Sequence, residues 1–85
     1  MARNVRKVIE ATFHDVLTQS GLSLNGSLRD DTILLESGLD SLGFAILVAR
    51  LDEDLGYDPF SIAEEAYYPI TFRDFVGFYE THQPA

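Results

Sequence analysis

Cysteine is absent from this chain of 85 residues, which excludes disulfide bridges, thiolate metal sites and a thiol nucleophile supplied by the protein itself. No apolar run approaches the length of a membrane span, and no signal-peptide pattern opens the chain, so we expect a cytoplasmic protein without membrane partners. Positive charge is also scarce, because 6 Lys and Arg residues stand against 14 Asp and Glu residues and the net charge is −8. Nucleic acid is therefore not an expected partner, since its phosphates would be repelled.

The length of the chain allows one small domain, which we expect to span residues 1–85 with an ordered core over about residues 4–82. A hydrophobic share of 46% is enough for a real core and argues against disorder. The surplus of negative charge favours protein partners with basic docking patches. Alternatively, the acidity serves solubility alone. We expect a monomer.

Apolar residues recur at steps of three and four positions over residues 4–18, 41–55 and 71–81, and this spacing predicts three main helices. A fourth, short helix is expected over residues 62–66. The predicted fold is all-α: a small up-and-down four-helix bundle with a long loop, residues 22–39, between the first two helices. The expected core consists of Val5, Val8, Ile9, Phe13, Val16, Leu17, Phe44, Leu47, Val48, Leu51, Leu55, Phe72, Phe75, Val76 and Tyr79.

Several residues mark the expected ends of these helices. Gly21 suits a carboxy-terminal cap for the first helix, Ser61 is expected to cap the short one, and Thr71 with Asp74 forms a shortened capping box for the last. Phe78 lies off the apolar stripe of the last helix. Both histidines, His14 and His82, are expected in solvent without a partner, and the loop is expected to be pinned by Leu22, Leu24, Leu28, Ile33, Leu34 and Leu35.

The segment Gly38-Leu39-Asp40-Ser41-Leu42 leads into the second helical pattern and places the Ser41 hydroxyl at a junction between loop and helix. Another enzyme could reach a hydroxyl at such an exposed helix start. Free backbone N–H groups and the positive end of the helix dipole would favour a phosphodiester there. Leu42 can anchor or present the first turn, and Gly38 permits a sharp turn in the approach. The alternative is that Asp40 or Ser41 is simply an N-cap, and both interpretations can hold together.

From about Asp30 to Leu55, including the approach Asp30-Asp31-Thr32-Ile33-Leu34-Leu35-Glu36-Ser37, the chain resembles the phosphopantetheine-attachment region of acyl and peptidyl carrier proteins. The resemblance implies that Ser41 carries covalent 4'-phosphopantetheine, and that Asp40 helps to hold a metal ion for the transferase that installs it. It implies a free-standing carrier, a phosphoprotein that holds its cargo as a thioester. The implied partners are a phosphopantetheinyl transferase with coenzyme A, an acyl- or aminoacyl-loading ligase, and a downstream synthase or transferase.

The second helical pattern also predicts an outward face that is more apolar than solubility requires. We interpret this face as a docking surface for partner enzymes, with acidic residues at its rim. The alternative is a helix buried on two sides, with Phe44 and Ile46 both in the core. The predicted docking residues are Leu42, Ala45, Ile46, Ala49, Asp52 and Glu53.

The cargo is not fixed by these patterns. Ile46 and Ala49 stand where carriers of fatty-acid synthesis usually have polar residues, and Arg50 adds a positive charge. These differences favour specialised biosynthesis or aminoacyl transfer, with fatty-acid synthesis as the alternative. Four residues after the central helix could line a cargo pocket or simply pack in the core: Phe60, Ile62, Tyr67 and Tyr68.

We expect neither an enzyme nor a metal site of the chain's own. A hydrolase using Ser41 would need a histidine base nearby and a glycine-flanked nucleophile turn, and the sequence has no such turn. A calcium loop starting at Asp52 fails because Gly56 falls at position five instead of six. An unmodified helical adaptor remains a further alternative to the carrier.

Overall fold

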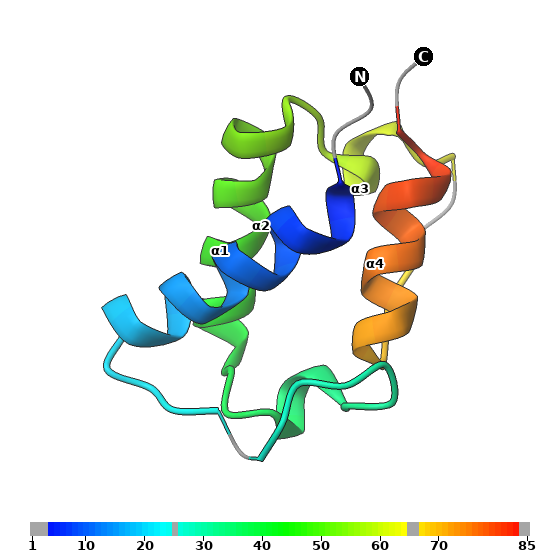
Figure 1. Cartoon of the computed structure of the whole chain (residues 1–85). Helices are drawn as coiled ribbons and strands as arrows, with labels where there is room; N and C mark the ends of the chain where they lie inside the picture. Colours follow the sequence, from blue (N-terminus) through cyan, green and yellow to red (C-terminus); the bar gives the residue numbers. More distant parts are fainter. Residues whose placement is uncertain (1–3, 25, 65–66, 84–85) are drawn as a thin grey trace.

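A computed structural model of the chain describes residues 4–24, 26–64 and 67–83 (Figure 1). Within these ranges the secondary structure is helical: α1 (Val5–Gln19), the 3-10 helix η1 (Leu34–Glu36), α2 (Ser41–Leu55), α3 (Pro59–Ile62) and α4 (Phe72–Thr81). The described residues contain no strand, and one isolated antiparallel bridge joins Ile33 to Thr71. The Cα radius of gyration is 12.2 Å, as expected at about 12 Å for a compact chain of this length. The all-helical prediction is therefore confirmed.

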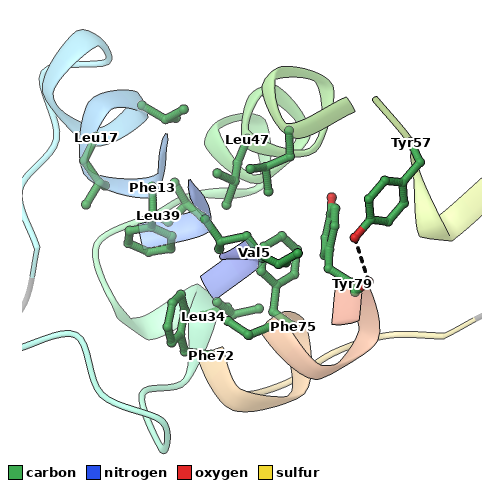
Figure 2. Close-up of a cluster of buried hydrophobic side chains, with 14 residues drawn as sticks. Val5, Phe13, Leu17, Leu34, Leu39, Leu47, Tyr57, Phe72, Phe75 and Tyr79 are labelled. Atoms are coloured by element: carbon green, nitrogen blue, oxygen red, sulfur yellow. Dashed lines mark hydrogen bonds between the residues drawn. The ribbon is translucent and has the colours of Figure 1, made fainter. Parts of the chain in front are cut away.

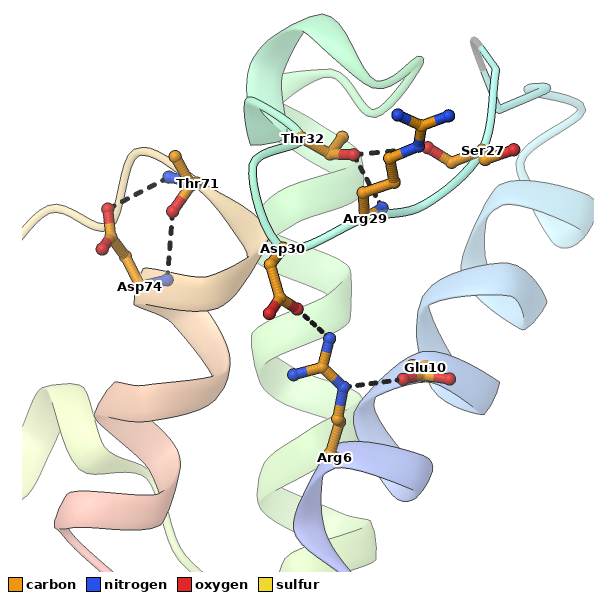
Figure 3. Close-up of polar contacts among 8 residues, drawn as sticks. All are labelled: Arg6, Glu10, Ser27, Arg29, Asp30, Thr32, Thr71 and Asp74. Atoms are coloured by element: carbon orange, nitrogen blue, oxygen red, sulfur yellow. Dashed lines mark hydrogen bonds and ion pairs between the residues drawn. The ribbon is translucent and has the colours of Figure 1, made fainter.

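Local capping explains why α1, α2 and α4 begin where the sequence predicts. Asn4 caps the start of α1 by accepting a 3.1 Å bond from the Lys7 N–H. The end of α2 is also set locally, because its C-cap Gly56 has a φ of 83°, which is readily accessible to glycine. At the start of α4 the predicted capping box is present (Figure 3). The Asp74 N–H donates to Thr71 Oγ1 at 3.1 Å, and Asp74 Oδ2 accepts from the Thr71 N–H at 3.2 Å.

The short helix is misplaced in the sequence prediction. It spans Pro59–Ile62 rather than residues 62–66, and its cap is Asp58, not Ser61. Proline is favoured at the first helical position, where it loses no hydrogen bond, and Asp58 accepts from the Phe60 N–H at 2.9 Å. Proline therefore starts this helix instead of only ending the one before. Residues 65 and 66 of the predicted helix lie outside the described residues.

The core lies where α1, α2 and α4 meet, and Leu34 and Leu39 of the long loop complete it (Figure 2). Most predicted core residues are buried, and Val8, Phe44, Val48 and Leu55 pack against the cluster while half-buried. None of the helices in the described ranges is long and apolar enough to cross a bilayer.

Two tyrosines hold the α2–α3 connection against α4. The Tyr57 hydroxyl donates a 2.7 Å bond to the Tyr79 carbonyl oxygen. The Tyr79 hydroxyl is itself buried and has no partner among the described residues, and burial raises the pKa of Tyr79. An unpaired buried hydroxyl is a cost to folding.

Phe78 and His82 differ from the prediction. Phe78 is buried rather than set apart, because its ring packs against Phe60 at a centroid distance of 4.9 Å and against Tyr67 at 4.5 Å. The His82 ring lies 4.6 Å from that of Phe78, and its Nδ1 is 3.0 Å from the Phe78 carbonyl oxygen, so His82 has a partner. His14 is exposed, as expected.

The long loop is fastened to the start of α4 by backbone bonds. The Leu34 N–H donates to the Ile70 carbonyl at 2.9 Å, and the N–H groups of Phe72 and Arg73 donate to loop carbonyls of Thr32 and Asp30 at 2.8 and 2.9 Å. Arg6 adds ion pairs to Asp30 and Glu10, and Thr32 closes a turn with Ser27 and Arg29 (Figure 3). The approach to Ser41 is thus held by the fold.

Only some of the loop side chains predicted to pin it do so. Leu34 is buried, and Leu22, Leu24 and Leu28 pack against the core, but Ile33 and Leu35 are 41% and 66% exposed. The single turn of η1 directs only Leu34 inward, while the bridge to Thr71 holds Ile33 at the surface through its backbone.

Candidate functional site

Ser41 is the first residue of α2, and its side chain is exposed. Among the described residues, nothing forms a hydrogen bond with its hydroxyl, and no acceptor meets the backbone N–H groups of Ser41 and Leu42. The first turn of a helix has such orphan donors, and they attract anions. The site therefore combines a reachable hydroxyl with two open donors.

Asp40, not Ser41, is the N-cap of α2. Its Oδ1 accepts a 2.6 Å bond from the Gly43 N–H, and its extended backbone ends the loop. The simple capping interpretation is thus correct for Asp40. Its second carboxylate oxygen has no partner among the described residues and faces solvent with the exposed side chain. That oxygen is available to a cation brought by another protein.

Gly43 has a structural role that the sequence reasoning missed. A Cβ at this position would lie 2.8 Å from Leu39 Cδ1 and 3.0 Å from Asp40 Oδ1. Glycine therefore lets Leu39 pack and Asp40 cap in the same turn. The signal in the sequence was glycine in a helical stretch, a residue that weakens helices. The atoms that approach Gly43 most closely belong to the chain itself.

Gly38 is required by the backbone. Its φ is 110°, and a Cβ there would collide with the carbonyl oxygen of Ser23. Residues with side chains rarely adopt this conformation. The predicted sharp turn before Ser41 is therefore present, and it brings the start of the long loop against its end.

The outward face of α2 is exposed along its length. Leu42 is 69% exposed and Ile46 is 38% exposed, so the alternative that places Ile46 in the core is wrong. Phe44, in contrast, turns toward the core and packs on Phe75 at a centroid distance of 5.5 Å. The other predicted docking residues are also exposed: Ala45, Ala49, Asp52 and Glu53. Their docking role stays a prediction.

Arg50 does not add free positive charge to this face. Its guanidinium donates to Asp15 Oδ2 at 2.6 Å and to Gln19 Oε1 at 3.1 Å, and both partners belong to α1. The hydrogen bond with Asp15 raises the pKa of Arg50 further. Arg50 therefore joins α2 to α1, and the exposed charges near Ile46 and Ala49 on α2 are those of acidic residues.

An apolar cavity of about 160 Å³ lies close to this site. It is lined by Leu34 and Leu35 of η1, Phe44 of α2, and the pair Tyr68 and Pro69 before α4. Of the four residues predicted to line a cargo pocket, only Tyr68 lines this cavity. The cavity depends on the pairing of residues 33–34 with residues 70–71, a contact between distant segments that no local pattern predicts.

The other three predicted pocket residues lie elsewhere. Phe60 packs on the core, and Ile62 is 52% exposed. Tyr67 lines a separate pocket of about 480 Å³ beside α4, which mixes basic and acidic side chains such as Arg73 and Glu80.

Metal or hydrolytic chemistry at Ser41 would need further side chains, either a cluster of metal ligands or a histidine base. No three His, Asp or Glu side chains in the described ranges cluster as metal ligands would. Neither histidine hydrogen bonds to Ser41 in the described residues, and the carboxy-terminal end of α4 lies away from the start of α2 (Figure 1).

Comparison of the chain with protein-family models, with curated proteins and with solved structures finds no match. The resemblance of residues 30–55 to carrier proteins therefore stays a hypothesis from the motif. Its support comes from the geometry around Ser41.

Proposed function

We propose that this protein is a carrier, and that Ser41 is the residue to which phosphopantetheine is attached. One observation carries the proposal: an exposed serine hydroxyl without a partner in the described chain, beside two open backbone donors at the start of α2. The attached group would supply a flexible arm whose thiol holds an acyl or aminoacyl cargo as a thioester. The proposed arrangement of the helices is the up-and-down bundle.

The proposed attachment reaction is a phosphoryl transfer catalysed by a separate transferase. The Ser41 oxygen attacks the phosphorus next to pantetheine in coenzyme A and forms a new P–O bond. The pyrophosphate P–O bond breaks, adenosine bisphosphate leaves, and the serine proton passes to a base of the transferase. The N–H groups of Ser41 and Leu42 would then face the new phosphodiester.

Asp40 contributes to this proposal in two ways. Its capping oxygen fixes the first turn that presents Ser41. Its other oxygen is open to a cation of the transferase, which would offset the repulsion between carboxylate and phosphate.

The proposed partners bind to the exposed face of α2. Leu42 and Ile46 supply apolar contact at its centre, and Asp52 and Glu53 supply charge at the rim. Ile46→Glu is then expected to slow a cognate loading enzyme without changing helicity by circular dichroism. Loading at the normal rate would remove Ile46 from the interface. Specialised biosynthesis in the cytoplasm is the proposed setting.

Intact-mass measurement tests the carrier proposal. Wild type, incubated with coenzyme A and a broad-specificity transferase, is expected to gain one phosphopantetheine group, and Ser41→Ala none. Ser27→Ala is the matched control, because Ser27 is also an exposed serine. If Ser41→Ala is modified, or wild type is not, Ser41 is not the attachment site.

An unmodified adaptor is the second candidate, favoured by the apolar exposure of Leu42 and Ile46, which needs no cofactor to bind a partner. The same mass measurement separates the two candidates.

A further inference from the structure

The larger pocket, of about 480 Å³, lies on the outward face of α4, and we call it the α4 pocket. Its walls come from Arg6 of α1, Asp30 of the long loop, Tyr67 before α4, and residues of α4 itself. No described residue of α2 lines it, so it is separate from Ser41 and from the exposed face of α2. One side is open to solvent, and the chemistry of the lining therefore indicates the occupant better than the volume does.

Gly77 lies in the middle of the α4 pocket, one helical turn after Arg73 and one turn before Thr81. A Cβ added at Gly77 would meet nothing within 4 Å in the described chain, whereas at Gly43 the chain itself fills the space. Glycine weakens a helix interior by up to ~1 kcal/mol relative to alanine. Since packing within the described chain does not require this glycine, the helix backbone at Gly77 is open to a group from outside.

Arg73 provides an available positive charge at one end of the α4 pocket. Its side chain is exposed and forms no ion pair with the described residues. Arg6 and Asp30 pair with each other (Figure 3), and the Asp74 carboxylate accepts backbone bonds at the start of α4. Glu80 follows Arg73 by seven residues, about 10 Å along the helix axis. An anion is therefore favoured at the Arg73 end, where a guanidinium can bind a carboxylate through two parallel bonds.

Three aromatic rings form a row along another wall of the α4 pocket. The Tyr67 ring packs on that of Phe78 at a centroid distance of 4.5 Å, and the His82 ring meets Phe78 at 4.6 Å. Phe78 is buried, but Tyr67 is 40% exposed. A flat ring in the pocket can continue this row in the offset or edge-on geometry that aromatic pairs prefer.

We propose that the α4 pocket binds a small aromatic carboxylate, whose carboxylate pairs with Arg73 and whose ring lies over Gly77 against Tyr67. Arg73 and Gly77 are one turn apart, about 6 Å along the helix axis. A ring joined to a carboxylate by one carbon spans a similar length. The inference goes beyond the proposed carrier function and does not depend on it, because no described residue of α2 lines the pocket.

Amide NMR with phenylacetate, titrated into the unmodified full chain, provides the first test. Saturable shifts should be largest at Gly77 and Phe78, with a dissociation constant of about 1 mM, typical for a ligand of roughly ten non-hydrogen atoms. Acetate lacks the ring and benzyl alcohol lacks the charge, so each should bind at least about tenfold more weakly. Equal binding of either compound, no saturation by phenylacetate up to about 20 mM, or shifts centred on other residues would overturn the proposal.

Two arginine variants separate a specific ion pair from general attraction. Arg73→Gln is expected to weaken phenylacetate binding about tenfold, because the carboxylate loses its charged partner. Arg29→Gln is the matched control, since Arg29 is also exposed and does not line the α4 pocket, and binding should be unchanged. Equal weakening in both variants would show that net charge alone attracts the ligand and would overturn the proposed site.

Substitutions at the floor and the wall complete the test. Gly77→Leu covers the open backbone and should weaken binding tenfold or more, without a lower melting temperature, because leucine favours a helix more than glycine does. Tyr67→Ala removes the exposed ring and should weaken binding about fivefold. Undiminished binding in either variant would overturn the proposal. Ser41→Ala should bind phenylacetate as wild type does, and Gly77→Leu should still gain phosphopantetheine, so this proposal and the carrier proposal can fail separately.

Discussion

The starts of α2 and α4 share the same kind of N-cap bond but differ in whether their other N–H groups are bonded. At each, the N-cap side chain accepts a bond from the N–H three residues later, from Gly43 to Asp40 and from Asp74 to Thr71. At α4 the first two N–H groups are also bonded, to carbonyls of the long loop. At α2 the corresponding two groups meet no acceptor in the described chain. One helix start is closed by the fold, and the other is left open.

The side chains at these two starts differ in the same sense. The first residue of α4 is Phe72, which is 1% exposed, whereas α2 begins with the exposed Ser41. The third residue of α4 is Asp74, whose carboxylate accepts a bond from the Thr71 N–H, whereas its counterpart Gly43 in α2 has no side chain. Capping thus stabilises both helix starts, whereas packing and additional acceptors close only the start of α4.

The largest effect should come from truncating the first residue of each helix. Phe72→Ala is expected to cost about 3–5 kcal/mol in free energy of unfolding, because it leaves a cavity in the core. Ser41→Ala removes an exposed hydroxyl that contacts nothing in the described chain and should stay within about 0.5 kcal/mol. Denaturant unfolding of both variants would check this, and comparable losses would break the contrast.

Glycine-to-alanine substitutions provide a matched pair. At Gly43 the added methyl group would meet Leu39 and Asp40, so we expect a loss of about 1–3 kcal/mol from overpacking, which exceeds the gain in helix propensity. At Gly77 in α4 nothing lies within 4 Å of the added Cβ, and stability should rise by up to ~1 kcal/mol. Thermal melts would show shifts of opposite sign. A stabilised Gly43→Ala would mean that Leu39 and Asp40 do not need the space that Gly43 leaves in the first turn of α2.

Removing the two caps should separate stability from modification. Asp40→Ala and Thr71→Ala are each expected to cost ~1 kcal/mol in unfolding free energy. Only Asp40→Ala should also slow transfer of phosphopantetheine to Ser41, measured as the rate of mass gain. Equal transfer rates in both variants would show that Asp40 acts at this site as a cap alone.

Removing the buried hydroxyl of Tyr79 should change the stability of the fold without changing the modification of Ser41. This hydroxyl has no partner among the described residues, so Tyr79→Phe should raise the unfolding free energy by about 1 kcal/mol. Modification of Ser41 should be unchanged. A destabilised Tyr79→Phe would indicate that the hydroxyl has a partner in solution, such as a buried water molecule.

The smallest expected effect is the change in stability at low pH that depends on Asp74. Bonds from the Thr71 and Ile70 N–H groups lower the pKa of Asp74, with the Thr71 backbone bond as the largest cause. Since the folded pKa lies below the unfolded one, this stabilisation is present above the unfolded pKa of about 4 and is lost as the pH falls through the folded pKa. The difference in melting temperature between wild type and Asp74→Asn should therefore shrink toward about pH 2. A difference that is constant with pH would contradict this linkage.

Local signals predicted much of the fold. Asn4, Asp40 and Thr71 are caps whose chemistry acts within three residues, so α1, α2 and α4 begin at or next to the predicted positions. The misplaced α3 depended on whether Pro59 ends a helix or starts one, and Asp58 decided this.

For the candidate site, the sequence located Ser41 at the helix start because that position is also set locally. It did not predict the apolar cavity or the exposure of Leu35, because both arise from the pairing of Ile33 with Thr71, residues that lie 38 positions apart. Nor did the sequence predict that the first N–H groups of α4 would be bonded while those of α2 stay open. That contrast depends on which carbonyls the folded loop presents.

The backbone bonds between the long loop and α4 also bear on the timing of synthesis. Asp30, Thr32 and Leu34 are made well before their partners at residues 70–73, and closing a loop of that length carries an entropic cost that the later contacts must offset. A growing chain that ends before α4 therefore has α1 and α2 but lacks the backbone bonds that hold residues 30–34 of the loop before Ser41. A nascent chain of this kind would be a poor substrate for any enzyme that recognises the folded loop, so the proposed modification of Ser41 should follow translation rather than accompany it.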